Sequence, residues 1–462
     1  MFQSNRFSNA PLRSFLAHVT ATLIMGGLLV LGGCDSGGAM EEDPSTTEKT
    51  TTLSGTITAD GGSSNLRTKD ARLNSSVGGA TVTAVRLNDD GSQTALDDTT
   101  ESNSDGSFKL EVKQQSEGAT VVVKAVKSET NFSSSVGVQV TDKASTTAQP
   151  MTDETAAEAQ VATSLNEKAG DAENATEALA DAATLVDNDV ASAILSGDTA
   201  PENVADLARS MEETREDYAN DAGASVTESD VANEEQDAYE TLQQALANAS
   251  SNAERAEAQE AFDAAMASSY EDAGASTDTQ AEIQQAGTKV ALNAVDASSL
   301  PDAAARGLER RATVLRAIAT GESVESTIDS EGAGSGVGDE MKADRSALLD
   351  SVRTAASRAD IDEARTAYRD SAKANLEEAF NMGPTDVQKG FDNLQTALDN
   401  LNGALSDAIS ATDNVDAGAV SDAFQTYYEN GVQTVQQVYS DRGAQSGPAN
   451  SAAKVTSKVG AF

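Results

Sequence analysis

The sequence lacks most of the side chains that enzymes use for nucleophilic or zinc-assisted chemistry. It has one histidine, His18, one cysteine, Cys34, and no tryptophan. Beyond Cys34 there is no histidine and no further thiol, which excludes Ser-His-Asp and Cys-His catalysis, the usual zinc sites and disulfides from that part of the chain. The sequence predicts a non-enzymatic protein with no catalytic residue, no metal ligand and no cofactor.

Aromatic residues are also scarce. They make up 4% of the 462 residues, and hydrophobic residues make up 38%. The core must therefore consist mainly of alanine, leucine and valine. Because each alanine contact buries little apolar area, the stability of such a core depends on long elements.

Basic residues are strongly outnumbered. The chain has 32 Lys and Arg against 75 Asp and Glu, a net charge of −43. So acidic a surface repels nucleic acid, and we expect no nucleic-acid partner. Runs such as 212–217 are expected to place like charges on helix faces in water. Because the screening length falls to about 3 Å at molar salt, the composition favours adaptation to high salt. The alternative is an acidic surface at ordinary salt.

The first 33 residues have the order of a secretory signal peptide. Arg6 and Arg13 precede an apolar run, 15–30, that is shorter than the roughly 20 residues of a membrane span. Leu31-Gly32-Gly33-Cys34 follows and resembles the lipobox of bacterial lipoproteins. The resemblance implies cleavage before Cys34, diacylglycerol on its sulfur and acylation of the new amine. The alternatives are ordinary secretion with a leftover thiol, or an uncleaved helix.

Lipidation would make the membrane a partner through the lipid anchor. It would place the protein in the cell envelope, at the outer membrane or the cell surface. The mature chain would then carry 30 basic and 75 acidic residues, a net charge of −45. Residues 34–50 lack hydrophobic periodicity and are predicted to form a flexible tether.

Residues 51–147 have the pattern of a small β domain. Apolar side chains alternate around Leu53, from 108 to 112 and from 121 to 125, and the runs 81–87 and 136–140 are further strand candidates. Alternation with Gly, Asn and Asp between the runs predicts an antiparallel sandwich.

Three segments of this domain, 53–58, 77–82 and 104–108, resemble the carboxypeptidase regulatory-like domain. That family implies a prealbumin-like sandwich of seven strands that serves as a spacer or binding module. Glu101, Asn103 and Asp105 also imitate the start of a calcium loop. The closing position would be Val112, which offers no carboxylate, so Asp105-Gly106 is predicted to be a hairpin turn.

Residues 151–440 are predicted to form a large all-α region, either a helical bundle or an array of helical-hairpin repeats. An apolar stripe runs from Phe391 to Ile409 behind Pro384, and Pro301 is expected to open a helix that Gly321 closes. We expect eight to ten helices. The repeat hypothesis rests on the likeness of 249–273 to 355–379. Residues 441–462 are predicted to be a disordered tail.

Four arginines stand out against the acidic background, namely Arg306, Arg310, Arg311 and Arg316. They could form a site for an anion or a partner, but pairing with the abundant carboxylates inside the protein is the expected outcome.

These patterns favour a non-enzymatic envelope lipoprotein in which the β module is a stalk and the helical region an interaction surface for an envelope protein or polysaccharide. One alternative is a substrate-binding lipoprotein for a polysaccharide or small ligand, which a deep pocket would favour. Another is a carboxylate-based hydrolase, which needs two carboxylates facing each other about 5–10 Å apart across a cleft.

Overall fold

The computed structural model describes residues 49–58, 76–169, 175, 177–224, 228–271, 273–331, 336–441 and 446–462. Cys34, the predicted signal peptide and nearly all of the predicted tether lie outside this set, so lipidation stays a prediction. Glu48–Phe462 is one compact unit. No helix among the described residues is long and apolar enough to cross a membrane.

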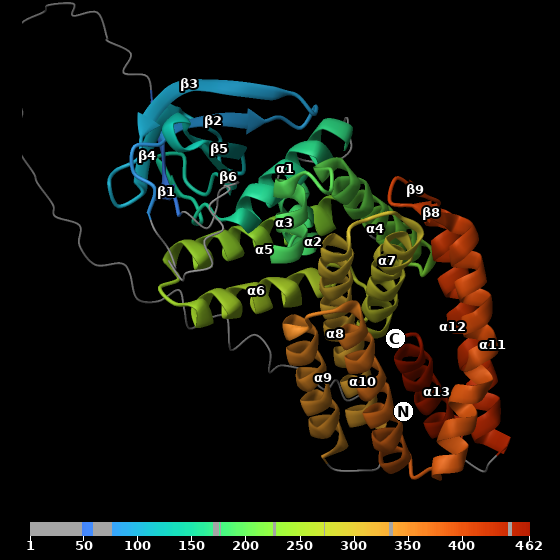
Figure 1. Cartoon of the computed structure of the whole chain (residues 1–462). Helices are drawn as coiled ribbons and strands as arrows, with labels where there is room; N and C mark the ends of the chain where they lie inside the picture. Colours follow the sequence, from blue (N-terminus) through green and yellow to red (C-terminus); the bar gives the residue numbers. More distant parts are fainter. Residues whose placement is uncertain are drawn as a thin grey trace, which may run out of the picture. The chain divides into compact units, whose positions relative to one another are not determined.

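The β region is a sandwich of two sheets followed by the helical region, which confirms the predicted fold class (Figure 1). One sheet has the strand order β4-β1-β7 and the other β3-β2-β5-β6. In the first sheet β1 is antiparallel to β4 and parallel to β7. The strands are β1 (Thr50–Thr56), β2 (Thr81–Leu87), β3 (Gln93–Glu101), β4 (Ser107–Lys113), β5 (Thr120–Lys127), β6 (Phe132–Gln139) and β7 (Ser145–Thr147).

The alternating side chains that predicted the sandwich form its core. Leu53, Leu110 and Val121 are at most 1% exposed and face the inside between the sheets. Two strands escaped prediction. β3 is mostly exposed and has no apolar alternation, and β7 has three residues, so neither carries a periodic signal.

Asp105 and Gly106 form a turn between β3 and β4, but not the predicted hairpin, because β3 and β4 lie in different sheets and the turn crosses from one sheet to the other. The Asp105 carboxylate accepts hydrogen bonds from the backbone N–H of Ser107 (2.9 Å) and its hydroxyl (2.7 Å). Gly106 has φ +77°, a left-handed conformation that favours glycine. Val112 is fully buried in β4, so it takes no part in a calcium loop.

The described helical region has thirteen α-helices, more than the eight to ten expected. The difference comes from short helices, since α2 and α3 have nine residues each and α13 lies in the predicted tail. The helices are α1 (Asp153–Ala169), α2 (Glu177–Leu185), α3 (Asn188–Ser196), α4 (Pro201–Asp221), α5 (Glu228–Asn248), α6 (Asn252–Ala267), α7 (Thr277–Ala297), α8 (Asp302–Glu331), α9 (Val337–Thr354), α10 (Arg358–Ala379), α11 (Pro384–Ala408), α12 (Ala417–Asp441) and α13 (Ser446–Gly460). A small hairpin of β8 (Ile409–Ala411) and β9 (Asn414–Val415) joins α11 to α12.

Two predictions about helix ends were wrong. Gly321 does not close a helix but lies inside α8, where a Cβ atom would collide with the Arg345 side chain of α9, so glycine allows these two helices to approach. The predicted disordered tail contains α13, with Ala449, Val455 and Val459 at most 1% exposed. Its small residues let it pack closely against α11, where a Cβ atom at Gly460 would collide with Leu394.

The repeat hypothesis holds for one pair of helices. The α6 and α10 segments both begin at a capping box, formed by Ser251 with Glu254 and by Ser357 with Asp360. Elsewhere the described helices differ in length from 9 to 30 residues. Tyr218 and Tyr428, which a repeat unit of about 52 residues would place at equivalent positions, lie near the end of α4 and in the middle of α12, respectively. The arrangement is therefore an irregular bundle.

The sandwich and the helices are joined by buried polar contacts. Gln243 of α5 is fully buried; its side-chain oxygen accepts a hydrogen bond from the Gln139 backbone N–H (2.8 Å), and its amide nitrogen donates to the Gln139 carbonyl (3.1 Å). It thus imitates a further strand beside β6. Tyr239 donates to the Gly137 carbonyl at 3.2 Å. These bonds fix α5 to one edge of the sandwich.

Candidate functional site

A pocket of about 630 Å³ lies where the segment after the sandwich meets the helices. Its lining comes from residues 149–158, which lead into α1, residues 186–188 at the junction of α2 and α3, α6 and α8, together with Leu246 of α5 and Arg353 of α9. Its lining is strongly charged. The charged lining residues are Glu154, Glu158, Asp187, Arg255, Glu257, Glu260, Asp263, Arg310, Arg311 and Arg353.

Arg311 and Asp263 form a buried ion pair in the pocket wall. Arg311 Nη2 lies 2.7 Å from Asp263 Oδ1, and Arg311 Nε donates to the Thr184 carbonyl at 2.7 Å. Gln259 donates a third hydrogen bond to Asp263. The side chain of Asp263 is 1% exposed. These hydrogen bonds hold both side chains of the pair in place, so the pair forms a rigid part of the pocket lining.

Glu158 is a nearly buried carboxylate of this pocket, where burial raises its pKa and a hydrogen bond from Gln149 lowers it only slightly. It is 8% exposed, and its Oε2 has no hydrogen-bond partner. Burial and the charge of Glu154 raise the pKa of Glu158 to about 8, although Arg311 opposes the shift. Burial and the charge of Asp187 raise the pKa of Glu154 to about 7. A group that donates hydrogen bonds or carries positive charge would therefore be favoured beside these carboxylates.

Internal pairing accounts for three of the four arginines that the sequence singled out. Arg306 and Arg310 bind Asp189, at 2.7 and 2.8 Å, and Arg310 also binds Asp187. Asp187 caps the N-terminus of α3, so these pairs also fix that helix. Arg316 differs, because it is 1% exposed and contacts the Ala461 carbonyl and the Phe462 ring rather than a carboxylate.

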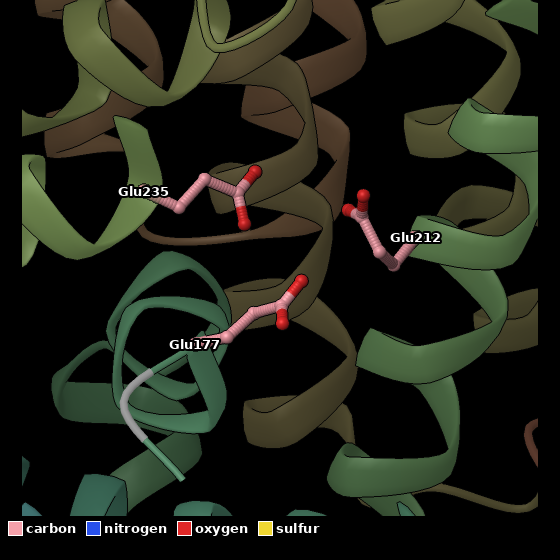
Figure 2. A group of neighbouring side chains, drawn as sticks. All are labelled: Glu177, Glu212 and Glu235. Atoms are coloured by element: carbon pink, nitrogen blue, oxygen red, sulfur yellow. The ribbon is translucent and has the colours of Figure 1, made fainter. Parts of the chain in front are cut away.

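A second cluster of charged groups lies in the core of the helical region (Figure 2). Glu177 of α2, Glu212 of α4 and Glu235 of α5 each present one carboxylate oxygen, and these oxygens lie within 4.8 Å of one another. The three carboxylates point toward a common centre in Figure 2. They are 5%, 8% and 0% exposed, so the cluster is almost closed to solvent.

Arg215 supplies the positive charge of this cluster. Its guanidinium contacts Glu212, lies 3.6 Å from Asp181 and lies 3.5 Å from Glu235. Tyr270 donates a hydrogen bond to Glu212 at 2.7 Å. Although burial lowers the pKa of Arg215, attraction to Glu212 and Glu235 raises it overall. Burial, reinforced by Glu212, raises the pKa of Glu235 well above its ordinary value.

Sequence reasoning missed this cluster and placed Glu212 on a face in water. The local signal was present in α4, where Arg215 falls on the apolar stripe of Leu207, Met211 and Tyr218. An arginine at such a position is expected to be buried, and a buried arginine is most often paired with carboxylates. Which helices supply those carboxylates depends on tertiary packing, which the sequence pattern does not reveal.

A groove of about 810 Å³ runs between α11 and α12. Amide and hydroxyl side chains line much of it, with Tyr427 among them. The amide and hydroxyl residues are Asn393, Thr396, Asn400, Thr426, Asn430 and Thr434. Such side chains both donate and accept hydrogen bonds.

No family model, no curated protein and no solved structure matches the chain.

Proposed function

We propose that the chain is a non-enzymatic, lipid-anchored protein of the cell envelope that binds a small polar ligand in the pocket beside Glu158. The volume of this pocket, about 630 Å³, is the observation that carries the proposal, because ligand sites commonly have 300–1,000 Å³. Of the functions that the sequence left open, a substrate-binding lipoprotein is the one that a pocket favours.

The chemistry of the pocket indicates the class of ligand. Glu158 is nearly buried and has an oxygen without a hydrogen-bond partner, while Asp263 is already bound by Arg311. A ligand that donates hydrogen bonds to Glu158, such as an amine or a compound with several hydroxyls, would satisfy that oxygen. The sandwich would then also help to form the ligand site, because Gln149 and Pro150, at its junction with α1, line the pocket.

Ligand capture from envelope extracts tests the pocket. Ala256 is exposed and lines the pocket, so Ala256→Trp should fill the space without disturbing the core. Purified wild-type protein and Ala256→Trp would each be incubated with the extract, washed and denatured, and the released small molecules measured by mass spectrometry. We expect compounds that the wild type retains and the variant loses. Identical profiles from two variants with equal circular dichroism would refute the proposal.

Lipidation has its own test. The lipobox resemblance of Leu31–Cys34 predicts that Cys34→Ser abolishes palmitate labelling and releases the protein from membranes. Persistent labelling of the variant would contradict the anchor without affecting the pocket.

The groove between α11 and α12 supports a second candidate, binding of a polysaccharide to the helical surface. Its amides and hydroxyls suit a hydroxyl-rich chain. An apolar protein interface has less support, because Val126 of β5 is the one large hydrophobic residue that is well exposed among the described residues. Binding of a polysaccharide that survives Ala256→Trp but is lost with Asn400→Trp would favour the groove.

The hydrolase alternative has the least support. Asp263 accepts hydrogen bonds from Arg311 and Gln259, and the two lining carboxylates whose pKa values are raised, Glu154 and Glu158, lie one turn apart on the same helix. Retaining and inverting glycosidases need two carboxylates on either side of the bond that breaks.

A further inference from the structure

We propose that Glu177, Glu212 and Glu235 bind one hard divalent cation, with calcium preferred, in the core of the helical region. The three side chains come from three different helices and converge on one point (Figure 2). The site is separate from the pocket beside Glu158, and neither proposal depends on the other.

Glu235 provides evidence for a bound cation that is independent of the clustering of acidic residues. It is 0% exposed, it points toward the other two carboxylates, and neither of its oxygens has a partner at full hydrogen-bond geometry. The Ser269 hydroxyl acts on it only as the smallest influence on its pKa. Its closest approach to Arg215 is 3.5 Å, beyond the usual range of a hydrogen bond. A buried carboxylate with so few donors is unfavourable, so the position favours a further positive partner.

The local charge agrees with a cation. Asp181 also lies against Arg215, so three carboxylates share a single guanidinium. Glu177 adds a fourth acidic side chain to a region almost closed to water. This excess of acidic groups over the one guanidinium favours a further cation. Arg215 would remain as a positioning residue that holds Glu212 and Asp181 in place.

The donor set indicates which ion fits. All donors are carboxylate oxygens, which calcium, magnesium and manganese prefer over zinc or copper. For three atoms no more than 4.8 Å apart, a common point exists within about 2.8 Å of each. Calcium binds oxygen at about 2.3–2.6 Å, whereas magnesium demands about 2.0–2.1 Å in strict octahedral geometry. Calcium therefore needs the smaller adjustment of the side chains.

Calorimetric titration tests the site directly. The purified full-length protein would be treated with a chelator and titrated with calcium chloride in 1 M potassium chloride, which screens weak binding to surface acids. We expect one site per chain. Glu235→Gln keeps the shape of the side chain but removes its charge, and should weaken that site at least about tenfold. Glu213→Gln is the matched control, because Glu213 is the neighbour of Glu212 on α4 but its side chain is 53% exposed.

Terbium luminescence locates the ion independently. The chain has no tryptophan, so an ion at this site would be excited mainly by Tyr270, which is hydrogen-bonded to Glu212. Tyr270→Phe should therefore lose most of the tyrosine-excited terbium emission, yet keep calcium affinity within a few-fold. This variant retains all carboxylates, so it keeps the test open if Glu235→Gln does not fold.

Two results would overturn the proposal. One is a wild-type protein without a single strong calcium site, which would mean that the cluster is neutralised by protons instead. The other is a strong site that Glu235→Gln and Tyr270→Phe both leave unchanged in affinity and emission, which would place the ion elsewhere.

Discussion

The sandwich and the helical region are stabilised in different ways. In the sandwich, the buried residues are apolar or neutral, such as Leu53, Val121 and Thr120, and none of its described charged residues is buried. The helical region buries many charged side chains among its alanines. They are Glu158, Glu177, Asp181, Asp206, Glu212, Arg215, Glu235, Asp263, Glu309, Arg311, Arg316, Arg365 and Lys458.

The difference follows from composition. β-Branched residues on two facing sheets fill a sandwich core without polar groups. Alanine-rich helices bury less apolar area per contact, and long side chains from neighbouring helices fill the remaining space. Buried ion pairs add little net stability, but removing one partner leaves an uncompensated charge. The helical region should therefore be the part of the molecule that responds to charge.

The largest expected effect is that of salt. Basic side chains such as Arg215, Arg311 and Lys458 form ion pairs in the interior. Few basic residues are therefore left to pair with the acidic residues on the surface. Each like-charged pair one turn apart destabilises a helix by roughly 0.2–0.5 kcal/mol at low salt. We expect the thermal midpoint to rise by about 10 °C or more between about 0.05 and 2 M potassium chloride, as this repulsion is screened. A flat midpoint across that range would rule out the adaptation to high salt.

Loss of Arg215 should have the largest effect of any single substitution. Arg215→Met leaves Asp181, Glu212 and Glu235 without their counter-charge and should lower the free energy of unfolding by about 3–5 kcal/mol. Urea unfolding at fixed salt measures it. Arg209→Met removes a half-exposed pair with Glu213 on the same helix and should cost less than about 1 kcal/mol. Equal losses would mean that the buried cluster is no more important than a surface pair.

Gln243 tests how firmly the two regions are coupled. Gln243→Ala leaves the backbone N–H and carbonyl of Gln139 buried without these partners, which should cost about 1–3 kcal/mol. Unfolding followed by circular dichroism should also become less cooperative, because the sandwich then loses a polar contact with α5. Gln244→Ala, at the neighbouring exposed position, is the control. A loss no greater than that of the control would indicate that α1, rather than α5, holds the sandwich.

The structure of the sandwich was easier to predict from the sequence than that of the helical region. The reason is again that the sandwich core is apolar, whereas the helical core contains charged side chains. Period-two alternation around Leu53 and Leu110 encodes both strand and burial, so the sandwich was predictable except for the polar strand β3. In the helices, the apolar stripe of α11 was predictable up to Leu405, whereas Ile409, expected at its end, lies in β8. The partners of Arg215 were not predictable, because they depend on which acidic helices pack together. The pocket was not predictable either, since its lining comes from six separate segments of the chain, from residue 149 to residue 353.

The smallest expected effect is a pH dependence that arises in the pocket. Glu158 faces Glu154, Arg311, Gln149 and Tyr239, and its pKa of about 8 lies far above the ordinary value. The pKa of Glu154 is about 7. Between about pH 5 and 8 the folded protein therefore holds protons that the unfolded chain has released. The free energy of unfolding must then fall as pH rises through this window and level off above about pH 8.

Glu158→Gln removes the larger of these two contributions, because an amide does not titrate. The variant should show a shallower decline of the thermal midpoint between pH 5 and 8, by a few degrees, and should match or exceed the wild type at pH 9. Glu257→Gln, at an exposed position of the same pocket, should follow the wild-type curve. If wild type and Glu158→Gln decline in parallel, Glu158 is ionised in the folded protein at neutral pH. The ligand would then have to balance a full negative charge, which would restrict the ligand class to cations.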